Sequence, residues 1–171
     1  MGVGEGPEAG EAEAVESRRD RFASAIYGSI FVTGLVGALS QHNATARAAA
    51  VSVMSTTAVF WLAHVWAELL AERAATAKLG GWPRFLRLAW REWPIVEAGA
   101  LPFLALALAW AGVYANGVGF DAAIAVGVAQ LLTWGAIVGR RTRLPWWKSA
   151  AAGVLDAALG LAIIGLEVLI H

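Results

Sequence analysis

The sequence predicts an all-α integral membrane protein with five transmembrane helices. Of its 171 residues, 58% are hydrophobic and only 15% are charged, whereas a soluble domain carries about 25% charged residues. Long runs without a formal charge recur along the chain, each near the roughly 20 residues that span a bilayer. We therefore expect the lipid bilayer as the main partner. The formal net charge of zero gives no reason to expect nucleic-acid binding.

The first 17 residues differ from the rest of the chain. The segment MGVGEGPEAGEAEAVES is acidic, rich in Gly, Ala and Glu, and almost free of large apolar side chains. Such a segment cannot bury enough surface to offset its ordering entropy, so we expect a disordered acidic tail over 1–17. It lacks the positive region and cleavage pattern of a signal peptide. Residues 18–171 are then predicted to form a single transmembrane helical domain.

Five spans follow from the uncharged runs and their flanks. We place them at about 22–40, 48–71, 94–114, 120–139 and 147–170. The third begins at Pro94, and proline is well tolerated at a first helical position. The fifth is interrupted by Asp156, a residue type that costs about 2.5 to 3.5 kcal/mol at the centre of an inserted helix.

The positive charges predict an orientation. Twelve of the thirteen Lys and Arg residues fall on one side of the five-span arrangement, and Arg47 alone falls on the other. Because cytoplasmic loops carry the excess of Lys and Arg, the N-terminus is predicted to lie in the cytoplasm and the C-terminus outside. The expected location is the plasma (inner) membrane, crossed several times.

A short amphipathic helix is predicted between the second and third spans, in GGWPRFLRLAWREWP. Its arginines and its large apolar residues take different helical sides, namely Arg84, Arg87 and Arg91 against Leu86, Trp90 and Trp93. This pattern is typical of a helix that lies in the plane of the lipid headgroups.

Small residues recur at every fourth position within the predicted spans. Examples are Ser29, Thr33 and Gly37 in the first span and Gly135 and Gly139 in the fourth. Such stripes let helix backbones approach closely. They fit either a compact bundle or a seam between copies, and we expect a homo-oligomer.

Polar side chains occur in the predicted cytoplasmic half of every span. The candidates for ion binding or proton relay are His64, Glu68, Glu97, Asp156, Gln130 and Tyr27. His64 and Glu68 are four residues apart and so share one helix face. Ionisable groups inside a membrane usually face a bundle interior or an aqueous cavity, where they mark ion pathways or relays.

Two chemistries fit these candidates equally well. The proposed metal ligands are His64, Glu68, Glu97 and Asp156, a set that suits a divalent ion such as Mn²⁺ or Fe²⁺. The same residues could instead relay protons, with histidine exchanging them near neutral pH. Structural alternatives are that Glu68 reaches the interface, that Glu97 caps its helix and that His64 is a hydrogen-bonded packing residue. No cofactor is assigned, and a divalent metal ion would be bound as a substrate.

Three segments resemble the vacuolar iron transporter family. They are GAIVGRRTRLPWWKSAAAGVLDAALGLAIIG near the C-terminus, EAGALPFLALALA in the third span and IYGSIFVTGLVGA in the first. The resemblance implies a five-span fold and passage of a divalent metal ion such as iron. The family's first span carries an Asn-Asp-Gly motif, where this chain has Tyr27, Gly28 and Ser29. In addition, VFWLAHVW is similar to the second span of prokaryotic lysosomal-type potassium channels.

The functional hypothesis is therefore a transporter or channel for a cation, either a divalent metal or protons. The alternative is a structural or accessory membrane protein whose polar residues serve helix packing. We do not expect an enzyme, because the sequence contains no nucleophile–base pair, no His-Glu-x-x-His motif and no glycine-rich phosphate loop.

Overall fold

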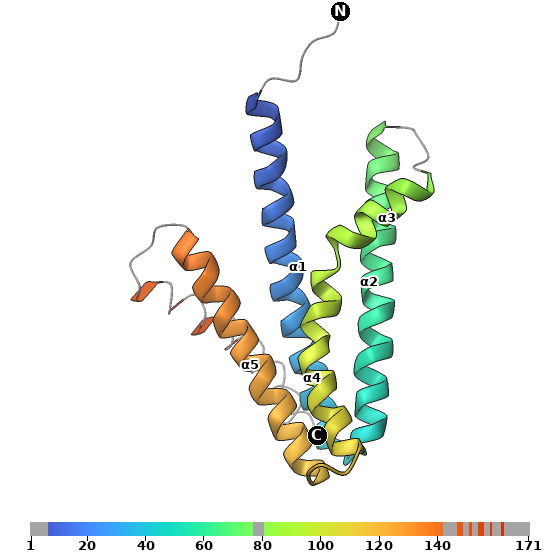
Figure 1. Cartoon of the computed structure of the whole chain (residues 1–171), viewed down its shortest axis with the longest axis vertical. Helices are drawn as coiled ribbons and strands as arrows, with labels where there is room; N and C mark the ends of the chain where they lie inside the picture. Colours follow the sequence, from blue (N-terminus) through green and yellow to red (C-terminus); the bar gives the residue numbers. More distant parts are fainter. Residues whose placement is uncertain are drawn as a thin grey trace, which may run out of the picture.

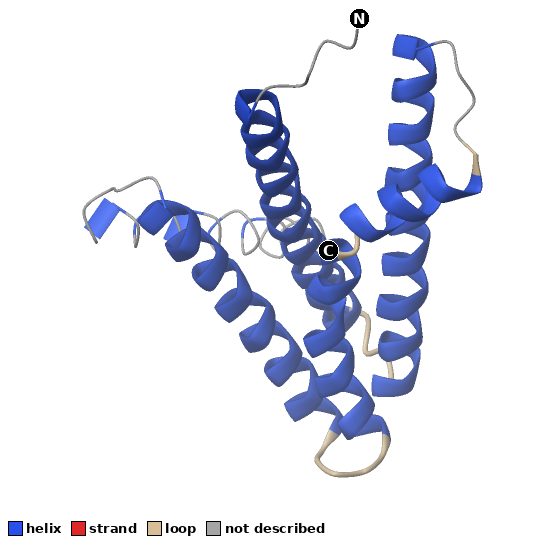
Figure 2. Ribbon diagram, turned by 45° about the horizontal axis from the view of Figure 1, so that its top comes forward, coloured by secondary structure: helices blue, strands red, loops and turns tan. Residues whose placement is uncertain are grey.

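The computed structural model describes residues 7–76 and 81–141, and positions 147, 148, 151, 154, 155, 158 and 162. Over 7–141 it has five helices: α1 (Pro7–Gln41), α2 (Ala46–Thr76), α3 (Trp82–Arg91), α4 (Pro94–Trp110) and α5 (Asn116–Arg141). Figures 1 and 2 show that these helices make up the fold, with no strand in the described part of the chain. The all-α prediction is confirmed.

Three of the described helices are long and apolar enough to cross a membrane. They are Arg21–Gln41, Ala46–Ala74 and Asn116–Arg140, with mean hydropathies of 1.7, 1.5 and 1.8. α3 and α4 pass the same test only when taken together, and they are bent by 52° relative to each other. The expected fifth span at 147–170, including Asp156, lies outside the described residues except for isolated positions.

The N-terminal segment differs from our expectation. We predicted disorder over 1–17, but the structure places residues from Pro7 onward in α1. The physical reason is that Ala and Glu are among the strongest helix formers, although they cannot form a core. Pro7 stands at the first helical position, which proline tolerates.

The predicted short helix between the second and third spans is confirmed as α3. It follows Gly81 and runs across α2 near the upper end of the bundle in Figure 1. Its buried residues Leu88 and Ala89 pack on Val65 of α2. The indole Nε1 of Trp61 donates a hydrogen bond of 3.0 Å to the Ala89 carbonyl. Trp90, which we assigned to the apolar side, is 70% exposed.

α4 ends four residues earlier than the predicted boundary at 114. Gly112 takes a positive φ of 80°, which only glycine adopts freely. The amide of Gly112 donates to the Ala109 carbonyl at 3.0 Å, and that of Val113 donates to the Leu108 carbonyl at 3.0 Å. This pair of bonds is the Schellman motif, which satisfies the last carbonyls and stops the helix.

Small residues let the helices approach closely around α4 and α5. Gly28 of α1 faces Ala98 of α4, and Gly127 of α5 faces Thr33 of α1. Val32, Val36, Val53, Leu106 and Phe120 belong to the main core. The part of the predicted stripe at Ser29 and Thr33 is therefore buried within one chain, while the homo-oligomer stays a prediction.

The lower end of the bundle is fastened by the Asn116 side chain. Its Oδ1 accepts a hydrogen bond from the Ala46 amide, and its Nδ2 donates to the Ala44 carbonyl at 3.1 Å. These bonds tie the turn before α2 to the start of α5. At the same end, the guanidinium of Arg47 lies 5.7 Å from the centre of the Trp110 ring.

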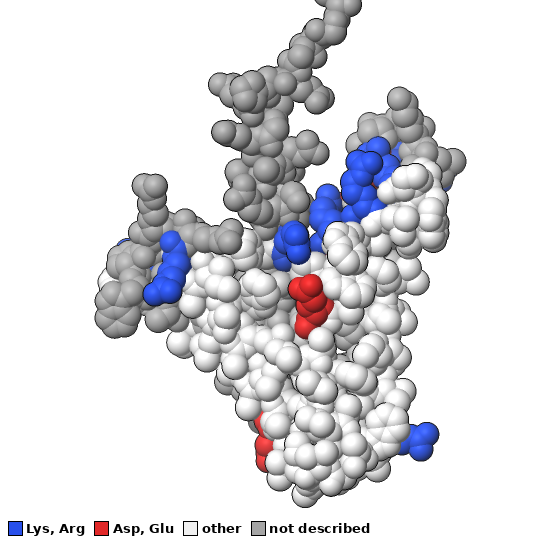
Figure 3. Space-filling view, viewed as in Figure 1, with Lys and Arg blue, Asp and Glu red and all other residues white. Residues whose placement is uncertain are grey.

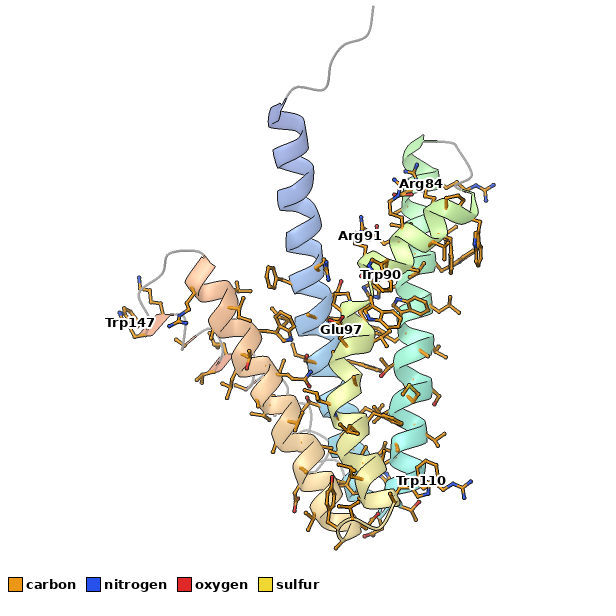
Figure 4. All side chains as sticks on the ribbon, viewed as in Figure 1. Arg84, Trp90, Arg91, Glu97, Trp110 and Trp147 are labelled. Carbon is orange, nitrogen blue, oxygen red and sulfur yellow. The ribbon has the colours of Figure 1, made fainter. Side chains whose placement is uncertain are left out.

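Positive charge collects at the opposite, upper end. Figure 3 shows Lys and Arg side chains over the upper ends of α2, α3 and α5. Arg84 and Arg91 lie at this end and Trp110 at the other (Figure 4). Arg47, which lies over Trp110, is therefore at the opposite end from Arg84 and Arg91.

Gly127→Ala is expected to destabilise the fold, because a Cβ there would collide with the Oγ1 of Thr33 and crowd its Cβ and Cγ2 at 3.2 and 3.3 Å. Turning the threonine therefore does not relieve the contact, and overpacking costs about 1 to 3 kcal/mol. Thermal unfolding in detergent should show a lower midpoint. The matched control is Gly117→Ala on the same helix, where a Cβ meets nothing within 4 Å. Equal midpoints for the two variants would contradict this packing.

Candidate functional site

The upper end of the bundle contains an open cleft of about 390 Å³. It is lined by Ala23, Ser24 and Tyr27 from α1, His64 and Glu68 from α2, and Glu92 from the turn between α3 and α4. Three segments far apart in the sequence thus meet at one site. At 1.5 Å per residue, Glu68 and His64 lie about 12 and 18 Å from the end of α2.

Glu92 is the most buried ionisable group of the cleft, with a relative exposure of 3%. The hydroxyl of Ser24 donates a hydrogen bond of 2.6 Å to its Oε2. Nε of Arg91 donates to its Oε1 at 3.3 Å. Both carboxylate oxygens therefore have a partner, as a buried charge requires.

Arg91 joins two carboxylates. Besides Glu92, it contacts Glu68 of α2, where its terminal nitrogen lies 2.9 Å from Oε2. With both carboxyl groups ionised and the guanidinium always charged, these three side chains carry one net negative charge. The arginine also connects α2 to the α3–α4 turn, and through Ser24 the connection reaches α1.

Two aromatic side chains, Tyr27 and His64, line the cleft, and both contact the ring of Phe60 beside it. The ring centres of Tyr27 and Phe60 lie 5.5 Å apart in a stacked arrangement, and those of Phe60 and His64 lie 5.1 Å apart. Phe31 stacks on Phe60 in turn, with ring centres 4.7 Å apart. Tyr27 is 55% exposed, so its ring is accessible from outside the bundle. Within the described part of the chain, His64 has these ring contacts but no hydrogen-bond partner.

Of the predicted site residues, the structure brings together His64, Glu68 and Tyr27. Glu97 does not join them: it is exposed on α4 (Figure 4) and does not line the cleft. Gln130 is half-buried in α5 and does not line the cleft, and its Oε1 has no partner among the described residues. Asp156 lies outside the described residues.

The predicted metal ligands are therefore not assembled in the described part of the chain. His64 and Glu68 share the cleft, but Glu97 lies elsewhere. Over the residues that the structure describes, no group of three or more His, Cys, Asp or Glu side chains could hold a metal ion.

Sequence reasoning missed Glu92 and Ser24. Glu92 stands in WREWP, at the end of the stretch that was assigned to the short amphipathic helix, and it was not considered as a site residue. One signal could have found it: it is the single acidic residue in the stretch from 82 to 94, among three arginines. Only the fold places it opposite Ser24.

Comparison with known proteins does not assign the chain to a family. No protein-family model matches the chain, and no curated protein or solved structure matches it. The resemblance to the vacuolar iron transporter family therefore stays a prediction, and the geometry of the cleft is the basis for a proposed function.

Arg91→Gln is expected to lower stability strongly, because it leaves Glu92 as a buried carboxylate without its cation. Breaking a buried pair from one side costs about 3 to 5 kcal/mol. Unfolding midpoints in detergent measure the effect. Adding Glu92→Gln should restore part of the loss, since the unpaired charge is then gone.

The matched control is Arg84→Gln on the same helix. Arg84 pairs with Glu72, and both side chains are well exposed, at 44% and 30%. Exposed pairs contribute little, so this control should unfold close to wild type. Similar losses for the Arg84 and Arg91 variants would contradict the assignment of a special role to Arg91.

Proposed function

We propose that this chain is a multi-pass plasma-membrane protein that passes a monovalent cation, in the first instance protons, through the upper-end cleft. The observation that carries the proposal is the composition of that cleft. It combines His64 and the exposed Tyr27 with two carboxylates, those of Glu68 and Glu92, which both pair with Arg91. Ionisable groups at membrane depth usually face a cavity and mark a pathway.

Protons are favoured over a divalent metal for two reasons. Magnesium-like and calcium-like ions require six or more oxygen ligands, and Fe²⁺ or Mn²⁺ would use the four predicted ligands, of which Glu97 lies away from the cleft. A proton needs only a chain of exchangeable groups and water. Since one water takes about 30 Å³ of liquid volume, the cleft has room for several.

The second candidate is a structural or accessory membrane protein. The observation that favours it is the double pairing of Arg91 with Glu68 and Glu92. Charges paired in this way stabilise the arrangement of the helices, and this role requires no transport. In this alternative, His64 and the rings around it are packing residues.

Orientation is part of the proposal. The excess of Lys and Arg at the upper end supports a cytoplasmic upper end and an external lower end. Because the chain has no cysteine, each introduced thiol is unique. In intact cells, Val113→Cys, in the turn after α4, is expected to react with an impermeant maleimide. Gly81→Cys, before α3, should react only after permeabilisation. The opposite labelling pattern would refute the orientation.

Proton flux tests the transport proposal. Protein reconstituted in liposomes with an enclosed pH dye should dissipate an imposed pH gradient faster than empty liposomes. Glu68→Gln and His64→Gln should each lower that rate, because they remove cleft groups that exchange protons. Glu97→Gln is the matched carboxylate control, and it should keep the wild-type rate. Folded wild-type protein without flux would favour the accessory-protein alternative.

A further inference from the structure

The cleft has two features that the passage of a proton leaves unused, namely the aromatic rings of Tyr27 and His64 in its lining and its size. Tyr27, Phe60 and His64 form a continuous set of ring contacts with centres 5.1 to 6.2 Å apart. A volume of about 390 Å³ greatly exceeds what a proton or a bare ion needs. We propose that the cleft is a binding site for an organic ammonium group.

Electrostatics favours a cation with a single charge. The formal charges of Glu68, Glu92 and Arg91, which pair with one another, sum to one negative charge. Both oxygens of Glu92 are engaged, by Ser24 and Arg91. Glu68 is different: its Oε2 contacts Arg91, and its Oε1 has no hydrogen-bond partner in the described part of the chain. That oxygen, on a side chain 41% exposed, remains available to an ammonium ion.

The rings favour an organic ammonium over a small inorganic cation. The face of an aromatic ring attracts a cation within about 6 Å of its centre, and quaternary ammonium groups are often bound in this way. The exposed ring of Tyr27 and the carboxylate of Glu68 both line the cleft. An ammonium ion in the cleft would have both the Tyr27 ring and the Glu68 carboxylate among its lining groups.

The inference goes beyond the proposed function, since it concerns binding and does not require that any cation crosses the membrane. Two sources could supply the group: a soluble amine, or the headgroup of an amine-bearing phospholipid. Both present the same chemistry to Tyr27 and Glu68, and the experiment separates them.

The first experiment is calorimetric titration of the purified full chain in detergent with tetramethylammonium chloride, against sodium chloride at equal ionic strength. Saturable binding of tetramethylammonium alone is expected. Tyr27→Leu should weaken it by about 3- to 30-fold, the loss of one cation–π contact. Tyr27→Phe keeps the ring and should bind like wild type. Glu68→Gln should also weaken binding, whereas Glu97→Gln, a carboxylate outside the cleft, should not.

The second experiment identifies the source. The chain is placed in nanodiscs of mixed phosphatidylethanolamine and phosphatidylglycerol, and the retained lipid is identified by native mass spectrometry. Selective retention of phosphatidylethanolamine, lost in Tyr27→Leu, supports a lipid headgroup. Binding of tetramethylammonium with no lipid preference supports a soluble amine.

Three results would overturn the inference: no saturable binding to folded wild type, equal affinities of wild type, Tyr27→Leu and Glu68→Gln, or selective retention of phosphatidylglycerol. Circular dichroism verifies that each variant is folded. Because titration uses no gradient, its outcome is independent of flux. Proton flux without ammonium binding would refute this inference alone, and binding without flux would refute only the transport proposal.

Discussion

The upper half of the bundle depends on the guanidinium of Arg91. Moving a charge out of water is costly, and the attraction between opposite charges offsets that cost only when the hydrogen bonds are well formed. Arg91 donates hydrogen bonds to Glu68 and to the buried Glu92. The hydroxyl of Ser24 donates to the other oxygen of Glu92. Four side chains from α1, α2, α3 and the turn after α3 thereby hold one another in place.

This interaction explains why a cleft exists. α1 and α2 each pack more extensively on α4 than on each other. At the lower end, Asn116 ties the turn before α2 to α5, so the helices are close there. At the upper end, α1 and α2 are connected through the polar side chains of Ser24, Glu92, Arg91 and Glu68, next to the 52° bend between α3 and α4. The space left between α1 and α2 is lined by the groups that Arg91 organises.

Much of the fold could be predicted from the sequence, because uncharged runs and helical periodicity are local properties. The helix after Gly81 followed from the alternation of arginines with large apolar residues. The end of α4 did not, since it depends on the left-handed conformation of Gly112. Helix formation over 7–17 was also missed. A composition poor in large apolar residues indicates that a segment cannot form a core, but it does not prevent the segment from forming a single helix.

The site was predicted only in part, for a physical reason. His64 and Glu68 share a helix face by spacing alone, so their pairing followed from the sequence. The choice between Glu97 and Glu92 did not. The predicted depth of Glu97 within the third span favoured this residue. However, close packing, as between Gly99 and Thr57, decides which face of α4 points into the bundle. That packing leaves Glu97 outside, and the bend before α4 brings Glu92 in.

The most direct test of this account is solid-state NMR of the chain in lipid bilayers, with ¹³C in glutamate carboxyl groups and ¹⁵N in arginine side chains. The Glu92 signal is assigned by its loss in Glu92→Gln. The account predicts an ionised Glu92 carboxyl carbon that is dipolar-coupled to a side-chain nitrogen of Arg91, with the coupling lost in Arg91→Gln. A neutral Glu92 carboxyl without coupling to Arg91 would contradict the central role of this arginine.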